Sequence, residues 1–420
     1  MPPPPLMAPA VIGDHAQFMK ILSSLDQQQP PPPTADADEA GAPRLQSARR
    51  RISEMLSNLD SQGNNTLHAV CASPPSSDGI AILKEIISTI SSSAGDGLAS
   101  QSPAQLLSLV SSFNAKNQIG CTPVWLCCGY GNVKLLSAMF DAIALHAGTR
   151  EGERRRLVRD LLSSTNTGGD SAILAACSRG HTDTLAFIVD MLKKSEGGEK
   201  DVNSSATTIQ QILTQPNKAG STPLFAAVGS SNSKCVDLLL SMLGGRSGGE
   251  TTHDHLLAKN RLGLTLLHIA CERDSGETVM SLLAPLASSS TTPVPILTML
   301  LSSRDANNAT PLMLASFLGN LSALAALRGP TLAATSSGSG EENLLDATDG
   351  GGRTAYYLAK AASKDEAAAL LARNVGDGGF GANVDIRDSS NISAEEAGER
   401  SKKAKEERDR KREEERAARA

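Results

Sequence analysis

Aromatic side chains are scarce in this sequence: they make up 3% of the 420 residues, and only one residue is a tryptophan. Strands favour aromatic and β-branched side chains, so this scarcity argues against a β-sandwich or barrel. The hydrophobic fraction of 40% is still enough for a folded core. That core must consist mainly of leucine, isoleucine, valine and alanine, which is typical of closely packed helices and predicts an all-α fold.

Long apolar runs and paired cysteines are also lacking. No stretch of about 18 apolar residues occurs, so we expect no membrane-spanning helix and no membrane partner. The opening MPPPPLMAPA has neither the basic nor the apolar segment of a secretory signal. The seven cysteines are odd in number, which favours reduced thiols in the cytoplasm or nucleus. A net charge of -5 gives no reason to expect a polyanion-binding body.

Sequence motifs for catalysis are missing as well. There is no GxxxxGK[ST] phosphate loop, no strand-borne GxGxxG and no GxSxG nucleophile elbow. Cys127 and Cys128 are adjacent and lack the CxxC spacing that closes on a metal. His253 and His255 flank Asp254, but no third ligand is in view. We therefore predict a protein that is not an enzyme and has no cofactor, no metal and no catalytic residue.

A short motif recurs seven times along the chain. Each copy can be aligned on an anchor residue with a small polar side chain: Asn65, Thr122, Ser171, Thr222, Thr265, Thr310 and Thr354. Five positions before each anchor stands an aspartate or asparagine: Asp60, Asn117, Asn166, Asn217, Asn260, Asp305 and Asp349. These two residue types are about a tenth of typical sequences, so seven coincidences indicate a true internal repeat.

The motif describes a turn followed by a helix. The Asx residue bonds its own backbone, and the glycine that precedes most anchors by two positions takes a positive φ. The anchor then caps the helix, and Pro123, Pro223 and Pro311 stand at the first helical position. Cysteines recur six positions after four anchors, at Cys71, Cys128, Cys177 and Cys271. This recurrence predicts a small, buried packing position rather than reactive thiols.

The motif resembles the ankyrin repeat, whose signature reads D-x-x-G-x-T-P-L-H-x-A. The best match is NKAGSTPLFAAV at 217–228, and the resemblance covers residues 60–372 in seven units. The histidine of the signature survives only as His68 and His268, and the second unit has Trp125 there, which we expect in the core. The resemblance implies a solenoid of stacked helix pairs that binds other proteins.

The repeat period is unusually long. Successive anchors are 57, 49, 51, 43, 45 and 44 residues apart, whereas an ankyrin unit has about 33. The additional residues contain Gly/Ser-rich joints, and an apolar run precedes most turns: RRISEMLSNL, QLLSLVSSF, RRLVRDLLSS, TIQQILTQ, DHLLA and PILTMLLSS. Each such insert therefore predicts a loop plus one extra short helix.

Composition divides the rest of the chain. Residues 1–43 are proline-rich and expected to be a disordered arm, in which AVIGDHAQFMKILSSL is either a weak helix on the first repeat or a docking motif. Residues 44–372 form the repeat array, and 373–394, rich in glycine, asparagine, aspartate and serine, form a flexible linker. Residues 395–420 are expected to form a single charged helix.

The charged C-terminal segment allows two interpretations. Favourable pairs four residues apart, such as Glu406 with Arg410, suit a solvated helix. From 399 to 420 there are ten basic and seven acidic residues, a local charge of +3, so a contact with RNA is the alternative. No aromatic residue is interleaved to stack on bases.

The family resemblance places a partner on the turn tips and on the inward side of the first helices. The tip residues are Gln118, Ile119, Lys218, Arg261 and Leu262, and the residues eight positions after an anchor are Tyr130, Arg179, Arg273 and Leu318. We therefore predict a monomeric, non-catalytic scaffold or adaptor. The alternative is an assembly chaperone or a ribosome- or RNA-associated factor that acts through the charged C-terminal helix.

Overall fold

The structure is a computed structural model. It describes residues 16–20, 56, 58–74, 76–93, 103–147, 151–194, 210–243, 250–287, 293–336, 344–373 and 379–419. The chain divides into two compact units, unit 1 (Met1–Ala226) and unit 2 (Ala227–Ala420), with the boundary inside helix α13.

Every named element of the described residues is a helix, which confirms the all-α prediction. The first helices of the repeats are α4 (Thr66–Ala72), α7 (Pro123–Tyr130), α10 (Ala172–Ser178), α13 (Pro223–Gly229), α16 (Leu266–Glu272), α19 (Pro311–Leu318) and α21 (Ala355–Ala361). The second helices are α5 (Ser77–Ser93), α8 (Val133–Ala147), α11 (Thr182–Lys194), α14 (Ser233–Leu243), α17 (Gly276–Ala287), α20 (Leu321–Ser336) and α22 (Asp365–Ala372).

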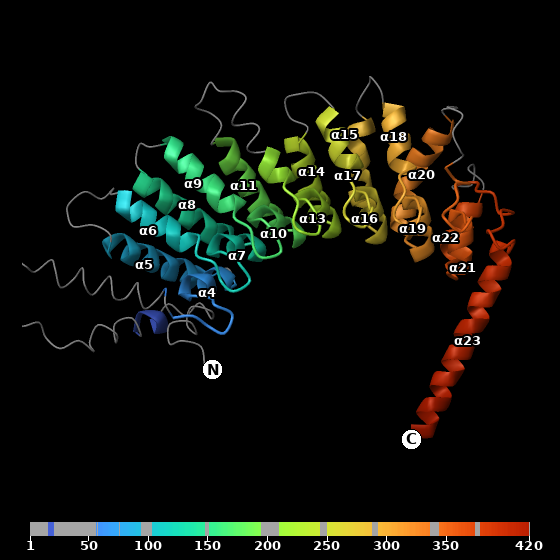
Figure 1. The fold of residues 1–420 in the computed structure, drawn as a ribbon, viewed down its shortest axis with the longest axis horizontal. Coiled ribbons are helices and arrows are strands. Elements are labelled where there is room, and N and C mark those ends of the chain that lie inside the picture. Colours follow the sequence, from blue (N-terminus) through green and yellow to red (C-terminus); the bar gives the residue numbers. More distant parts are fainter. Residues whose placement is uncertain are drawn as a thin grey trace, which may run out of the picture. The chain divides into compact units, whose positions relative to one another are not determined.

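The helices of each unit form two layers (Figure 1). In unit 1, α7 packs between α4 and α10, and α8 packs on α5 and α11. In unit 2, α19 packs between α16 and α21, while α17 packs between α14 and α20. Each unit therefore has one row of first helices and one row of second helices.

The predicted insert helices are present. They are α6 (Pro103–Phe113), α9 (Glu151–Ser163), the short turn 210–214, α15 (Glu250–Leu257) and α18 (Pro293–Leu301). α6 contacts α5 and α8, and α18 contacts α17 and α20, so these inserts join the layer of second helices. The apolar run expected before the first turn lies almost wholly outside the described residues.

The repeated turn forms as the Asx–Gly pattern predicts. The Oδ1 of Asn117 accepts a hydrogen bond of 2.8 Å from the Cys121 N–H, and the Gly120 N–H donates to the Asn117 carbonyl at 2.9 Å. Gly120 has a φ of 74°, and a Cβ there would lie 2.9 Å from the Thr167 nitrogen of the next turn. Glycine is needed both for the backbone conformation and for the approach of the neighbouring turn.

Successive turns are joined by backbone hydrogen bonds. In unit 1 the Gln118 N–H donates to the Gln62 carbonyl at 3.1 Å, and the Lys218 N–H donates to Gly168 at 3.0 Å. In unit 2 the Ser389 N–H donates to Gly351 at 2.9 Å. These bonds fix the register of one repeat on the next.

A second kind of link between repeats starts three positions after the anchor. His68 Nε2 lies 3.1 Å from the Cys121 carbonyl oxygen, and His268 Nε2 lies 3.1 Å from that of Ala309. The Thr265 N–H donates to His268 Nδ1 at 3.3 Å, so the other ring nitrogen carries the proton and donates to the next repeat.

A third link starts ten positions after the anchor, at the beginning of the second helix. The Asn132 amide donates to the carbonyls of Cys71 and Ser73 at 2.9 and 2.8 Å. The Asn320 amide does the same to Cys271 at 2.7 Å. The terminal carbonyl groups of α4 and α16 are therefore satisfied by a side chain of the next repeat.

Residues 388–393 form an eighth turn that the sequence analysis does not anticipate. The Ile392 N–H donates to Asp388 Oδ1 at 2.8 Å, and Asn391 takes a φ of 59° in the place of glycine. Ser393 caps the following helix, accepting from the Glu396 N–H at 3.2 Å. Phe380, which lies in the same segment, is fully buried. The described part of 373–394 is therefore more ordered than the flexible linker that the sequence predicts.

The helix after this turn, α23 (Ala394–Arg419), packs on α21 as an eighth first helix. Tyr356 donates its hydroxyl hydrogen to Glu395 at 2.9 Å, and Lys402 lies 3.3 Å from Asp365. Burial and the neighbouring Glu395 carboxylate raise the pKa of Tyr356 to about 12. Beyond Lys402 the described side chains are exposed, as the sequence predicts for a solvated helix.

The proline-rich arm is described only at 16–20, which is helical. Phe18 is fully buried there. This burial agrees with a short helix that folds onto the protein, whereas the rest of the arm lies outside the described residues.

Replacing Gly120 with alanine is expected to destabilise the protein by about 2 kcal/mol, because alanine must adopt a positive φ and its methyl group meets the next turn. Urea unfolding measures the loss. Gly229→Ala is the control, since no atom lies within 4 Å of a Cβ at that helix end. Equal midpoints for the two variants would contradict this account of the turn.

Acidification is expected to weaken the histidine link. Burial lowers the pKa of His268 below its ordinary value of 6.5. The unfolded chain therefore binds more protons there, and the free energy of unfolding falls as the pH drops from about 7.5 to about 5.5. His268→Phe, the residue type of the fourth repeat, should flatten this dependence in thermal melts. An unchanged pH dependence in the variant would refute the assignment.

The eighth turn and the start of α23 are expected to stabilise the end of unit 2. A chain ending at residue 378 loses the contacts on α21, whereas one ending at 403 retains them. Hydrogen exchange of the α21 and α22 amides should accelerate in the shorter chain and stay near the full-length rate in the longer one. Comparable exchange in both truncations would show that the turn contributes nothing.

Candidate protein-interaction surface

The structure exposes all the unit 1 residues predicted to meet a partner. Gln118 and Ile119 form the tip of the second turn, and Ile119 is 55% exposed. Lys218 stands at the same place in the fourth turn and is also exposed. Tyr130 ends α7, and Arg179 follows the end of α10. Turn tips and helix ends thus supply these side chains, and their role in binding stays a prediction.

Tyr130 and Arg179 form a preorganised pair. The Arg179 guanidinium lies over the Tyr130 ring, 4.6 Å from its centroid, although 46% of the Tyr130 side chain stays exposed. Arg179 Nη1 also donates to the Gly129 carbonyl at 2.7 Å. The hydrogen bond and the cation–π contact hold the guanidinium in place, which reduces the entropy that a partner must remove on binding.

Trp125 lies next to this pair, but its indole links two neighbouring repeats. Its indole N–H donates to the Asp170 carbonyl at 3.0 Å, the bond that His68 and His268 make in their own repeats. A Cβ at Gly129 would lie 3.5 Å from the Trp125 ring and 3.5 Å from Arg179. Both side chains therefore lie in van der Waals reach of position 129, and Trp125 is half-buried rather than a free contact residue.

Unit 2 repeats the arrangement with different residues. Arg261 and Leu262 form the tip of the fifth turn, where Leu262 is 67% exposed. Arg273 follows the end of α16 and is exposed. Leu318, at the end of α19, is half-buried, while the preceding Phe317 is 49% exposed. The sequence offset of eight positions misses Phe317, which stands seven positions after its anchor, where α7 has Gly129.

Among the unit 1 residues predicted to meet a partner, the charged side chains are cationic. Arg179 and Lys218 are exposed, while Asp170 is tied into the turns, accepting from Asn166 at 3.0 Å and from Asn217 at 2.8 Å. This arrangement favours a partner that brings carboxylates.

All seven cysteines are buried and none is in a disulfide, which confirms the predicted packing position. Burial raises the pKa of Cys127 and of Cys128 well above the ordinary thiol value, so neither forms a thiolate near neutral pH. Reactive cysteine chemistry is therefore unsupported at these two positions.

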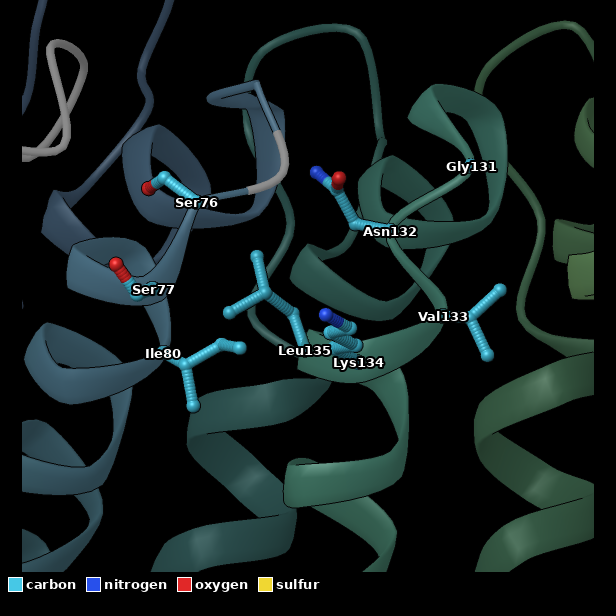
Figure 2. A pocket seen from close by; sticks show the side chains of 8 residues that line it. All are labelled: Ser76, Ser77, Ile80, Gly131, Asn132, Val133, Lys134 and Leu135. Atoms are coloured by element: carbon cyan, nitrogen blue, oxygen red, sulfur yellow. The ribbon is translucent and has the colours of Figure 1, made fainter.

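A pocket of about 240 Å³ lies between the starts of α5 and α8 (Figure 2). Its walls are Ser76, Ser77, Ile80, Gly131, Asn132, Val133, Lys134 and Leu135. Asn132 is occupied in the link to the preceding repeat, and Lys134 is the sole ionisable side chain of the lining. The pocket holds no acid–base pair and is the junction of two repeats.

No group of three or more metal-binding side chains comes together within the described ranges. His253 and His255 lie two residues apart on α15. Among the described helices, none combines the length and hydropathy needed to cross a bilayer.

The stacked turn–helix–helix units define a class of α-helical repeat proteins, and comparison with known families specifies which. Residues 145–246 match a family model described as ankyrin repeats in three copies. The chain therefore contains ankyrin repeats, as its sequence pattern predicts. Ankyrin repeats are generally protein–protein interaction modules. No curated protein sequence matches the chain.

Solved ankyrin repeat structures are similar to the chain at low identity. The ankyrin repeat domain of Bcl-3, described as a unique member of the IkappaB protein family, is 16% identical, with a TM-score of 0.39 over 74% of this chain and 94% of that one. The ankyrin repeat protein EF0377 is 18% identical, with a TM-score of 0.36 over 67% and 96% of the respective chains.

Proposed function

We propose that this protein is a monomeric, non-catalytic adaptor that binds partner proteins through its turn tips and the ends of its first helices. The observation that carries the proposal is the exposed Tyr130–Arg179 pair beside Ile119. Tyrosine and arginine are the residue types that most often dominate binding energy at protein interfaces. Because Arg179 is already fixed by Gly129, this pair provides a rigid contact with a low entropic cost.

The surface supports a particular partner chemistry. Ile119 and Tyr130 offer exposed apolar area, and Arg179 and Lys218 offer positive charge. A partner segment that combines carboxylates with an apolar side chain would complement both features. Seven buried cysteines without a disulfide fit a reducing compartment, so we place the adaptor in the cytoplasm or nucleus.

Partner recovery by affinity purification with mass spectrometry tests the proposal. Tyr130→Ala combined with Arg179→Ala is expected to reduce the recovery of the principal partners at least about tenfold, as expected for the loss of about 1.4 kcal/mol or more from a dominant contact. Circular dichroism should show unchanged helicity, because Trp125 keeps the repeats linked.

A matched control removes similar groups from the insert helices. Leu107 on α6 is 70% exposed and Arg156 on α9 is exposed, so Leu107→Ala with Arg156→Ala changes the same charge and a similar apolar area. The control should retain the partners. Equal recovery by both double variants would exclude the Tyr130–Arg179 site, and loss of all partners on truncation at 403 would favour the charged helix instead.

A further inference from the structure

Beyond Lys402, where α23 is exposed, the ion pairs are concentrated on part of the helix surface. Arg410 pairs with Glu414 at 3.6 Å, and Lys411 pairs with Glu407 at 2.9 Å. These two pairs lie on adjacent rows of one side of the helix, and the charges within each pair offset each other. Two of the basic residues in this part of α23 are thus paired with a carboxylate, and others are not.

Three other cations lie along one face of the same helix. Lys405, Arg408 and Arg412 are spaced by three and four residues, which places them on a common side. We call these three residues the basic stripe. All three are exposed, and none has a carboxylate partner among the described residues. Arg408 Nε instead donates to the Ala404 carbonyl of its own helix at 3.1 Å.

The helix offers no apolar surface beside the basic stripe. Between 399 and 419 there is no aromatic residue, and the apolar residues present are alanines. A helix that inserts into a lipid interface needs a large apolar face, and a stable protein interface needs a buried apolar core. Single-stranded nucleic acids are held by stacking on aromatic rings, which α23 lacks.

We propose that the basic stripe binds the phosphate backbone of a nucleic acid duplex. A DNA duplex carries one negative charge per about 1.7 Å of its axis, the densest regular array of anions available to such a helix. Lys405 and Arg412 are seven residues apart, or about 10 Å along α23, so the stripe meets several phosphates at once. Phosphate contacts carry no sequence information, so binding is independent of sequence.

The geometry limits the contact to one side of α23. Glu406 and Glu413 lie on other faces of the helix, where they repel phosphates. Asp409 lies four residues after Lys405 and three before Arg412, so it borders the basic stripe and lowers the net charge of this face from +3 to +2. The duplex therefore meets only this side of α23, which does not enter a groove that would surround it. This site is separate from the proposed adaptor surface, because it uses none of the turn or first-helix residues.

Fluorescence anisotropy of a labelled DNA duplex with the full-length protein tests the stripe. Three phosphate contacts predict that log K falls with log salt with a slope of about −2.7, or about 40-fold between 50 and 200 mM salt. Lys405→Gln, Arg408→Gln and Arg412→Gln together should reduce affinity at least about tenfold at the lower salt concentration.

The matched control removes the same charge from the other faces: Lys403→Gln, Arg410→Gln and Lys411→Gln. It should change the affinity less than about threefold, since these residues do not face the phosphates. An RNA duplex should bind comparably to DNA because the contacts go to phosphates alone. Circular dichroism checks that all variants remain helical.

Several results would overturn the proposal. Equal losses in the two triple variants would mean that net charge, not the stripe, governs binding. No binding of the wild-type chain at about 50 mM salt, or tighter binding of a single strand than of the duplex, would also exclude it. Comparable binding of the stripe to phosphatidylserine vesicles would reassign it to lipid. None of these outcomes alters the partner recovery expected for Tyr130 and Arg179.

Discussion

The hydrogen bonds that link neighbouring repeats within each unit are the constraint on which the rest of the structure depends. No single first helix is long enough to be stable alone, since α4 has seven residues and α7 has eight. Each gains its stability from a turn bonded to the next turn, as Gln118 is to Gln62, and from a side chain bonded to the next backbone. One such bond contributes about 1 kcal/mol, so the stack gains its strength from repetition.

The same constraint explains both the variation at one position and the candidate surface. The bond three residues after the anchor can come from His68, His268 or the indole N–H of Trp125, because each delivers a donor to the next repeat. With this register fixed, the ends of α7 and α10 lie side by side. The packing of the repeats therefore brings Tyr130 and Arg179 into contact, and no additional structural element is required to orient them.

The repeat can be predicted from the sequence at those positions where the side chain alone determines the backbone conformation. An Asx residue, a glycine and a capping threonine specify the turn at Asn117, and proline specifies the helix start at Pro123. The eighth turn escapes this logic because Glu395 occupies a position that is apolar or aromatic in the other repeats; Asn391 in place of glycine has a precedent in Asn308 of the sixth repeat. The Tyr130–Arg179 contact was not predictable either, since it depends on the distance between two helices.

The long period is compatible with this register because the additional residues leave the turns where they are. α6 packs on α5 and α8, and α18 packs on α17 and α20, so these two inserts thicken the layer of second helices. The Thr167 N–H still donates to Ile119 at 3.0 Å across an insert that contains all of α9. Because the turns are bonded directly to one another, the inserts can vary in length without moving the tips. The inserts therefore change the layer of second helices while the bonds between the turns are kept.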